Sequence, residues 1–184
     1  AADAGPDGGP DAADPLTAVT GIGQGEVRAT PVHIAAVAAV VAAGGTYREP
    51  YVVGRVERDG QALWRASPRS RPAWDPAQTR VIADGMRRAA TTGTARALAG
   101  VPGDWAAKTG TAQWQGSTVG WVAAYGTSPE TGEPVAVAVV LPPQRPADTK
   151  AGTLTSASAT VGGRSGGDAV QVLAAMARSA GDPR

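Results

Sequence analysis

The stretch Trp105–Gln113, Trp-Ala-Ala-Lys-Thr-Gly-Thr-Ala-Gln, carries the strongest structural signal in this sequence. Its pattern predicts a strand in which Lys108 and Gly110 share one face, while Thr109 and Thr111 share the other. A lysine ammonium and two hydroxyl groups suit a carboxylate ligand. Gly110 would let a ligand approach the backbone, whose N–H groups can hold an extended peptide or a developing oxyanion. The competing interpretation is a polar edge strand that the glycine weakens.

Helix signals lie on both sides of this strand. Thr30-Pro31 and Asp75-Pro76 each place a capping side chain before a proline, a typical helix start. The first helix is expected to end near Ala43, before Gly44-Gly45, and the second at Gly93. A third, amphipathic helix is expected over Asp168–Ala180. The predicted packing faces are Val32, Ala35, Ala36, Ala39, Val40 and Ala43 in the first helix, Val81, Ile82, Gly85, Met86 and Ala89 in the second, and Val170, Leu173, Ala174 and Ala177 in the third.

The remaining segments are rich in strand-forming residues. Tyr51–Glu57 and Gln61–Ala66 predict a hairpin. A three-strand meander is expected from Trp105–Trp114, Val119–Gly126 and Pro134–Leu141. The order of elements predicts an α+β fold, an antiparallel sheet flanked by helices.

Length and composition restrict the domain organisation. The 184 residues suit one domain, and Ala and Gly make up 64 of them, which predicts a thin core. Residues 1–14 are expected to be a flexible Ala-, Asp-, Gly- and Pro-rich segment, with 15–184 forming the ordered domain. Gln144–Gly166 is expected to be a long loop.

Charge and residue usage exclude several functions. A net charge of +1 gives no strong electrostatic case for nucleic acid binding. The chain has no Cys and one His, which excludes thiolate or multi-histidine metal centres. No apolar run is long enough to span a membrane, and no signal peptide is recognised.

Three further motifs lack the sequence context that their functions require. Gly21–Gly25 lacks the glycine spacing of a dinucleotide loop, and Gly103–Thr109 lacks the P-loop glycine before its lysine. Gly163–Gly167 fits a nucleophile elbow, but a loop precedes it and no His follows. His33, on the first expected helix, is interpreted as a surface histidine.

Several segments together resemble one protein family. In order and spacing they are similar to the C-terminal half of a bacterial penicillin-binding protein transpeptidase domain, which belongs to the serine D,D-transpeptidase and β-lactamase-like superfamily. The amino-acid usage resembles that of actinobacterial proteins. The segments are Ile22–Gly25, Thr30–Ala35, Ala42–Thr46, Gly85-Met86, Gly93–Ala95, Ala107–Gln113 and Gly120–Tyr125.

The family uses three motifs, and this chain carries one of them. Lys108-Thr109-Gly110 matches K-[ST]-G. None of the eight Ser residues has Lys three positions later, as S-x-x-K requires, and the absence of Asn excludes S-x-N. Without that activated hydroxyl, we expect this chain alone to be inactive as an enzyme. The resemblance makes it the C-terminal part of one incomplete transpeptidase domain, whose N-terminal half would be its partner.

The resemblance also implies residue roles. Lys108 and Thr111 would be catalytic, with the Thr111 N–H as an oxyanion donor. Lys108, Thr109, Gly110, Thr111 and Gln113 would bind the substrate, a D-Ala-D-Ala stem peptide of peptidoglycan or a β-lactam. Neither a metal nor a cofactor is implied. The parent protein would act outside the cytoplasm, in the cell envelope, anchored to the membrane by an N-terminal segment that is not in this chain.

Two other functions stay open. A non-catalytic binding or scaffold module of the cell envelope could derive from the same fold. A serine β-lactamase is less favoured, because the Gly-Gln-Gly and Thr-Pro segments resemble transpeptidases. A domain that lacks one half should also expose an edge or face of its sheet, which favours association.

Overall fold

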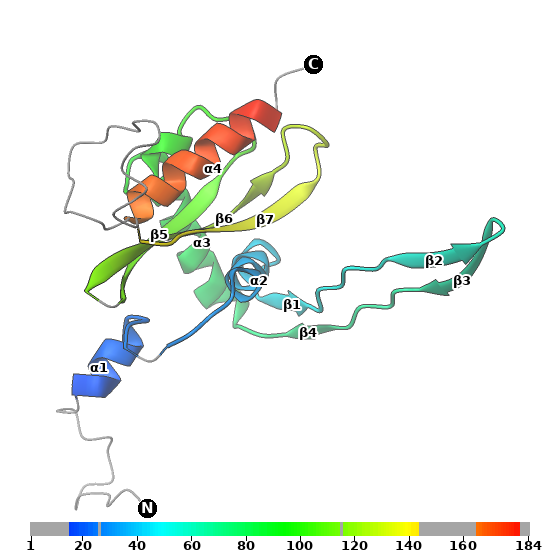
Figure 1. Cartoon of the computed structure of the whole chain (residues 1–184), viewed down its shortest axis with the longest axis horizontal. Helices are drawn as coiled ribbons and strands as arrows, with labels where there is room; N and C mark the ends of the chain where they lie inside the picture. Colours follow the sequence, from blue (N-terminus) through cyan, green and yellow to red (C-terminus); the bar gives the residue numbers. More distant parts are fainter. Residues whose placement is uncertain (1–14, 26, 115, 144–164, 181–184) are drawn as a thin grey trace, which may run out of the picture.

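A three-stranded antiparallel sheet forms the centre of the structure, a computed structural model that describes residues 15–143, except 26 and 115, and residues 165–180. The strand order is β5 (Ala106–Trp114), β6 (Ser117–Thr127) and β7 (Pro134–Leu141). Helix α2 (Pro31–Ala42) packs on one face, and α4 (Gly166–Ala180) covers the other (Figure 1). Helix α3 (Pro76–Thr91) packs beside β5. The predicted α+β arrangement of sheet and helices is confirmed.

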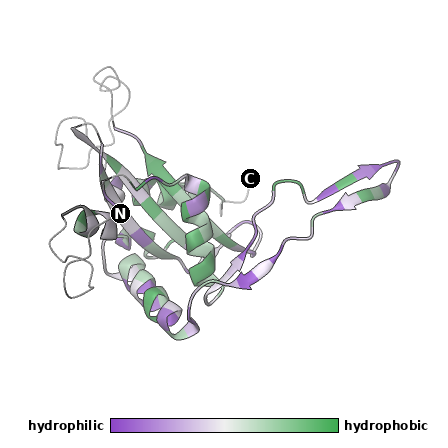
Figure 2. Ribbon diagram, turned by 90° about the horizontal axis from the view of Figure 1, so that it is seen from below, coloured by the Kyte–Doolittle hydropathy of each residue, from purple (hydrophilic) through white to green (hydrophobic). Residues whose placement is uncertain are grey.

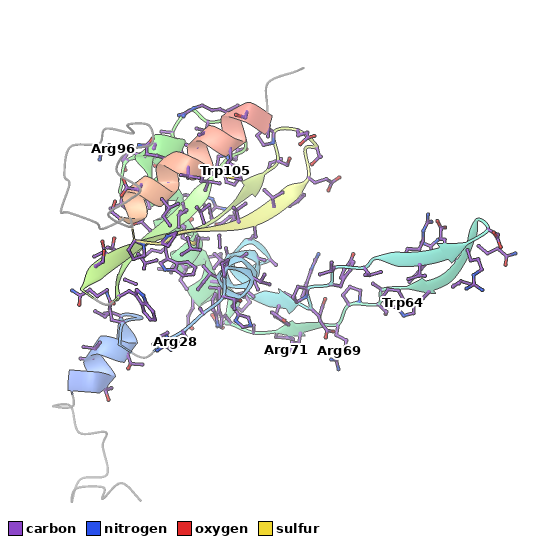
Figure 3. The ribbon with its side chains drawn as sticks, in the orientation of Figure 1. Arg28, Trp64, Arg69, Arg71, Arg96 and Trp105 are labelled. Carbon is purple, nitrogen blue, oxygen red and sulfur yellow. The ribbon has the colours of Figure 1, made fainter. Side chains whose placement is uncertain are left out.

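The main core lies between the sheet and α4. Strand alternation turns Ala107, Val122 and Ala124 toward this helix, and all three are buried. The indole of Trp105 is also buried here (Figure 3), and its Nε1 donates to the carbonyl of Pro102 at 2.8 Å. The predicted inward face of α4 is confirmed, because Val170, Leu173, Ala174 and Ala177 are all buried.

The opposite face of the sheet has a smaller core. It consists of Val41, Ala83, Met86, Ala106 and Tyr125. The packing faces predicted for α2 and α3 are wrong in part. Helix α2 buries Ala38, Val40 and Val41, and α3 buries Thr79, Ala83, Met86 and Ala90.

Both predicted helix starts are confirmed. The Thr30 hydroxyl accepts a hydrogen bond from the His33 N–H at 3.2 Å. The Asp75 carboxylate accepts two, from the N–H groups of Ala77 and Gln78, at 2.8 and 3.0 Å. These side chains satisfy N–H groups that the first helical turn cannot bond internally.

A hairpin projects away from the sheet and helices (Figures 1 and 2). Its strands are β2 (Arg55–Arg58) and β3 (Gln61–Arg65), and every residue in both is exposed. The predicted hairpin is confirmed, although its first strand begins later than expected. We call residues 49–69 the arm.

Four elements were not predicted. Strands β1 (Thr46–Arg48) and β4 (Ser70–Pro72) form a short ribbon at the base of the arm. Helix α1 covers Pro15–Gly21, and a 3-10 turn, η1, covers Arg96–Leu98. The expected flexible segment 1–14 and most of the expected loop 144–166 lie outside the described residues. Within the described residues, no helix is long and apolar enough to cross a membrane.

Candidate functional site

The site predicted from sequence lies on β5, an edge strand of the described sheet. Strand β6 pairs with one edge of β5, in a register that places Gly110 opposite Trp121 and Thr111 opposite Gly120. The other edge pairs with no strand in the described part of the chain. A strand edge that is unpaired presents N–H and C=O groups to which an extended peptide can bond.

Lys108 projects from the face of β5 that α2 and α3 border. Its side chain is exposed, and its Nζ donates a hydrogen bond to the carbonyl oxygen of Thr109. That contact folds the ammonium group toward the open edge of the strand. The lysine therefore supplies a positive charge next to backbone groups that a peptide could reach.

The two threonine side chains lie on the other face, as strand alternation predicts. The Thr109 hydroxyl is 2.9 Å from the hydroxyl of Thr94, which follows α3. The Thr111 hydroxyl accepts a hydrogen bond from the backbone N–H of Gly166 at 3.1 Å. Lys108 and the two threonine side chains thus lie on opposite faces of the same strand. Neither Thr94 nor Gly166 was predicted from the sequence as a site residue.

The start of α4 holds this face in place. The Asp168 carboxylate accepts hydrogen bonds from the N–H and the hydroxyl of Ser165, at 2.8 and 3.0 Å. The Ser165 hydroxyl accepts the Asp168 N–H at 3.2 Å. This is a reciprocal capping box, and its S-x-x-D pattern was the signal in the sequence that could have found it.

Glycines allow the start of α4 to lie close to the backbones of β5 and β6. A Cβ on Gly166 would lie 2.7 and 2.8 Å from the backbone oxygen and nitrogen of Gly110. A Cβ on Gly120, on the neighbouring strand, would lie 2.6 Å from the carbonyl carbon of Ser165. Only residues without side chains fit where the start of α4 crosses the sheet.

Gln24 is a further residue of the site that was not predicted from the sequence. Its Nε2 donates to the carbonyl oxygen of Thr111, and its Oε1 accepts the N–H of Gln113, each at 3.1 Å. The predicted site residue Gln113 therefore meets Gln24 through its backbone. The Gly-Gln-Gly turn at residues 23–25 was the available signal.

An apolar groove adjoins Lys108. It has a volume of about 550 Å³ and runs between α2, α3 and the sheet. Its apolar lining includes Ile34, Val37, Ile82, Met86 and Trp121. Ile82 and Met86 belong to the packing face predicted for α3, so part of that face lines an open groove.

Other titratable groups lie away from the motif. His33 is exposed on α2, as expected for a surface histidine. At the base of the arm, a hydrogen bond from Arg69 lowers the pKa of the Glu49 carboxyl. Among the described residues, no cluster of three His, Asp or Glu side chains could hold a metal ion.

Comparisons with known proteins identify one family and several structures with a similar fold. Residues 2–161 match the family described as the penicillin-binding protein transpeptidase domain. Penicillin-binding protein A from M. tuberculosis, as an imipenem acyl-enzyme complex, is 31% identical over 67% of this chain, with a TM-score of 0.58. A second structure of that protein is 27% identical over 94% of this chain, with a TM-score of 0.64.

A third similar structure describes the coordination of polymerization and crosslinking by a peptidoglycan synthase complex. It is 26% identical over 90% of this chain, with a TM-score of 0.62. The chain spans only 28%, 36% and 25% of the chains in these three structures. No curated protein sequence matches it.

Proposed function

The chain belongs to the family of penicillin-binding protein transpeptidase domains, and on that premise we propose that it forms the C-terminal part of a D,D-transpeptidase. The parent enzyme would crosslink peptidoglycan stem peptides outside the cytoplasm and would be acylated by β-lactams. The observation that carries the proposal is the Lys-Thr-Gly strand, which presents an open backbone edge beside a lysine and two hydroxyls.

Backbone direction supports the role of Thr111. In a strand, the N–H and C=O of one residue point toward the same neighbouring strand. Gln24 bonds the Thr111 carbonyl from the open edge, so the Thr111 N–H also points to that edge. An acyl-transfer intermediate that forms there would place its oxyanion against this N–H.

The side chains supply the other contacts. Lys108 would contribute a positive charge and help orient the proton transfers around the nucleophile. The hydroxyls of Thr109 and Thr111 would hydrogen-bond the terminal carboxylate of the D-Ala-D-Ala peptide or of a β-lactam. Gly110 would let that ligand approach the backbone, and Gln113 would contact it further along the strand.

The groove supports a divided active site. It lies between α2 and α3 and reaches Lys108 and Gly110, with mainly apolar residues on its walls. An apolar helix that carried the S-x-x-K serine and lysine would bury these walls and bring its hydroxyl beside Lys108. We propose that the N-terminal half of the domain supplies this helix.

Labelling with a fluorescent penicillin tests the proposal. The chain alone should acquire no covalent label, because it lacks the S-x-x-K serine. The complete protein should be labelled at that serine. A label on this chain alone would contradict the proposal, and a complete protein that contains no S-x-x-K helix would favour the non-catalytic scaffold.

A substitution at the motif sharpens the test. Thr111→Val removes the hydroxyl but keeps the shape and the backbone N–H. Because a hydrogen bond to a charged group contributes about 1.5–3 kcal/mol, acylation of the complete protein should slow about 10- to 150-fold. Thr127→Val makes the same change at the far end of β6 and should leave the rate unchanged.

A further inference from the structure

The side chain of Gln24 occupies part of the open edge of β5. Its amide bonds the carbonyl of Thr111 and the N–H of Gln113, the two edge groups on either side of Ala112. One residue of an added parallel strand would bond the same pair, with its N–H to the first and its C=O to the second. Gln24 thus replaces a strand residue with a side chain.

The loop around Gln24 is built to hold this contact. Gly23 and Gly25, on either side, both have positive φ angles, of 77° and 70°. The Gln24 N–H donates to the Val19 carbonyl at 3.0 Å, which ties the loop to the end of α1. Gln24 is half-buried, whereas the four described residues around it are exposed.

A second contact joins the same loop to the same strand. The guanidinium of Arg28 lies 5.4 Å from the ring centre of Trp114 (Figure 3 labels Arg28). The loop therefore contacts β5 at Thr111, Gln113 and Trp114. These contacts restrict the movement of the part of β5 that directly follows the Lys-Thr-Gly motif.

We propose that Gln24 is a positioning residue for the Thr111 N–H. Its hydrogen bond fixes the Thr111 carbonyl, and the N–H of the same residue then points into the site at a constant angle. The amide of Gln24 also ends the edge that a peptide can use, because the Gln113 N–H is already bonded. The backbone of a substrate strand can therefore pair with β5 only before Ala112, and Gln113 can contact the ligand only through its side chain. This inference rests on the proposed function.

The test compares two variants in the complete protein. Gln24→Met removes both hydrogen bonds at nearly constant size. Gln24→Glu keeps an acceptor for the Gln113 N–H but removes the donor to the Thr111 carbonyl. Gln61→Met is the matched control, because Gln61 is exposed at the tip of the arm. The measurements are the acylation rate constant and the binding constant for fluorescent penicillin, with amide exchange at Gln113.

Both variants at Gln24 should slow acylation about 10- to 100-fold, with little change in the binding constant, because small misplacements act on the transition state. Exchange at Gln113 should accelerate in Gln24→Met and stay slow in Gln24→Glu. Gln61→Met should change neither measurement. If Gln24→Met does not fold, Gln24→Glu carries the test.

Two results would overturn the inference. An unchanged acylation rate in the Gln24 variants would show that the Thr111 N–H is positioned without the hydrogen bond from Gln24. Faster acylation would show that Gln24 occupies a group that the substrate uses. If the complete protein without any substitution is not acylated, the proposed function is contradicted. Amide hydrogen exchange at Gln113 would still report the hydrogen bond to Gln24 in that case.

Discussion

The backbones of Gly120 and Ser165 are in such close contact that no side chain fits at position 120. A Cβ at position 120 would lie 2.6 Å from the carbonyl carbon of Ser165, so Gly120→Ala must displace the start of α4. We expect the free energy of unfolding to fall by about 1–3 kcal/mol, the usual cost of overpacking. The Gly166 N–H should also separate from the Thr111 hydroxyl. Urea unfolding measures the first effect.

Gly85→Ala is the matched control for that substitution. Gly85 is inside α3, and a Cβ there would meet nothing within 4 Å. Because Ala is the better helix former by about 1 kcal/mol, this variant should be more stable than the unchanged protein. Equal losses in the two variants would contradict the packing described at Gly120.

Tyr125 has a buried hydroxyl for which the described residues provide no hydrogen-bond partner. Burial raises the pKa of this phenol. A raised folded-state pKa means that its stability contribution is intact below the unfolded pKa of about 10 and is lost as the pH rises through the folded value. Tyr125→Phe should therefore stabilise the protein by about 1 kcal/mol at pH 7 and reduce its loss of stability above pH 10.

Urea unfolding at several alkaline pH values checks this. Tyr51→Phe, at an exposed tyrosine on the arm, is the control and should change neither quantity. A Tyr125→Phe variant that is less stable at pH 7 would show that the hydroxyl has a partner.

Among the elements, the arm contributes little to the stability of the rest. Both faces of β2 and β3 are exposed, and the hairpin contains exposed apolar residues such as Leu63 and Trp64. Replacing residues 51–66 by two glycines should change the free energy of unfolding by less than about 1 kcal/mol, because surface changes are usually small. Thermal unfolding followed by circular dichroism measures this.

A pair of tryptophans, both labelled in Figure 3, provides the control. Trp64→Ala on the arm should be nearly neutral, since half of its surface is already exposed. Trp105→Ala removes a buried indole beneath α4 and should cost about 3–5 kcal/mol. A large loss on removal of the arm would show that it stabilises the core.

The elements predicted well from sequence are those whose signals are local. Helix caps at Thr30 and Asp75 depend on side chains next to the backbone groups that they bond. The inward face of α4 could be predicted because its apolar residues lie on one side of the helix, and the sheet buries that side. The ribbon of β1 and β4 escaped prediction because three-residue strands rich in Arg and Pro show no alternation.

The faces of α2 and α3 show why the rest could not be predicted. An apolar pattern identifies residues that some element should cover, but not which element does so. In α3 the pattern selected Val81, Ile82, Gly85, Met86 and Ala89, and all of these except Val81 line the open groove. Likewise, Lys108 to Thr111 could be chosen from their motif, whereas Gln24 and Gly166 reach the site only through the tertiary fold.

In the molecule as a whole, the apolar groove and the unpaired edge of β5 both adjoin the Lys-Thr-Gly motif. The groove joins α2, α3 and the motif strand, and β5 and β7 are both edges of the described sheet. An apolar groove of about 550 Å³ beside a lysine is typical of a surface that another segment buries. This arrangement agrees with the expectation that an incomplete domain exposes part of its sheet.

Substitutions at two neighbouring residues on α3 distinguish a role of the groove in binding another segment from a role in the stability of this chain. Ile82 lines the groove, whereas Val81 is 73% exposed and does not. In this chain alone, both Ile82→Lys and Val81→Lys should change the free energy of unfolding by no more than about 0.5 kcal/mol, as surface substitutions usually do.

In the complete protein, the Ile82→Lys charge would be buried against the segment that carries the nucleophile, at a cost of several kcal/mol. That variant should lose labelling by fluorescent penicillin, and Val81→Lys should keep it. Equal labelling of both variants would show that the groove stays open in the complete protein, and the divided active site would then need another surface.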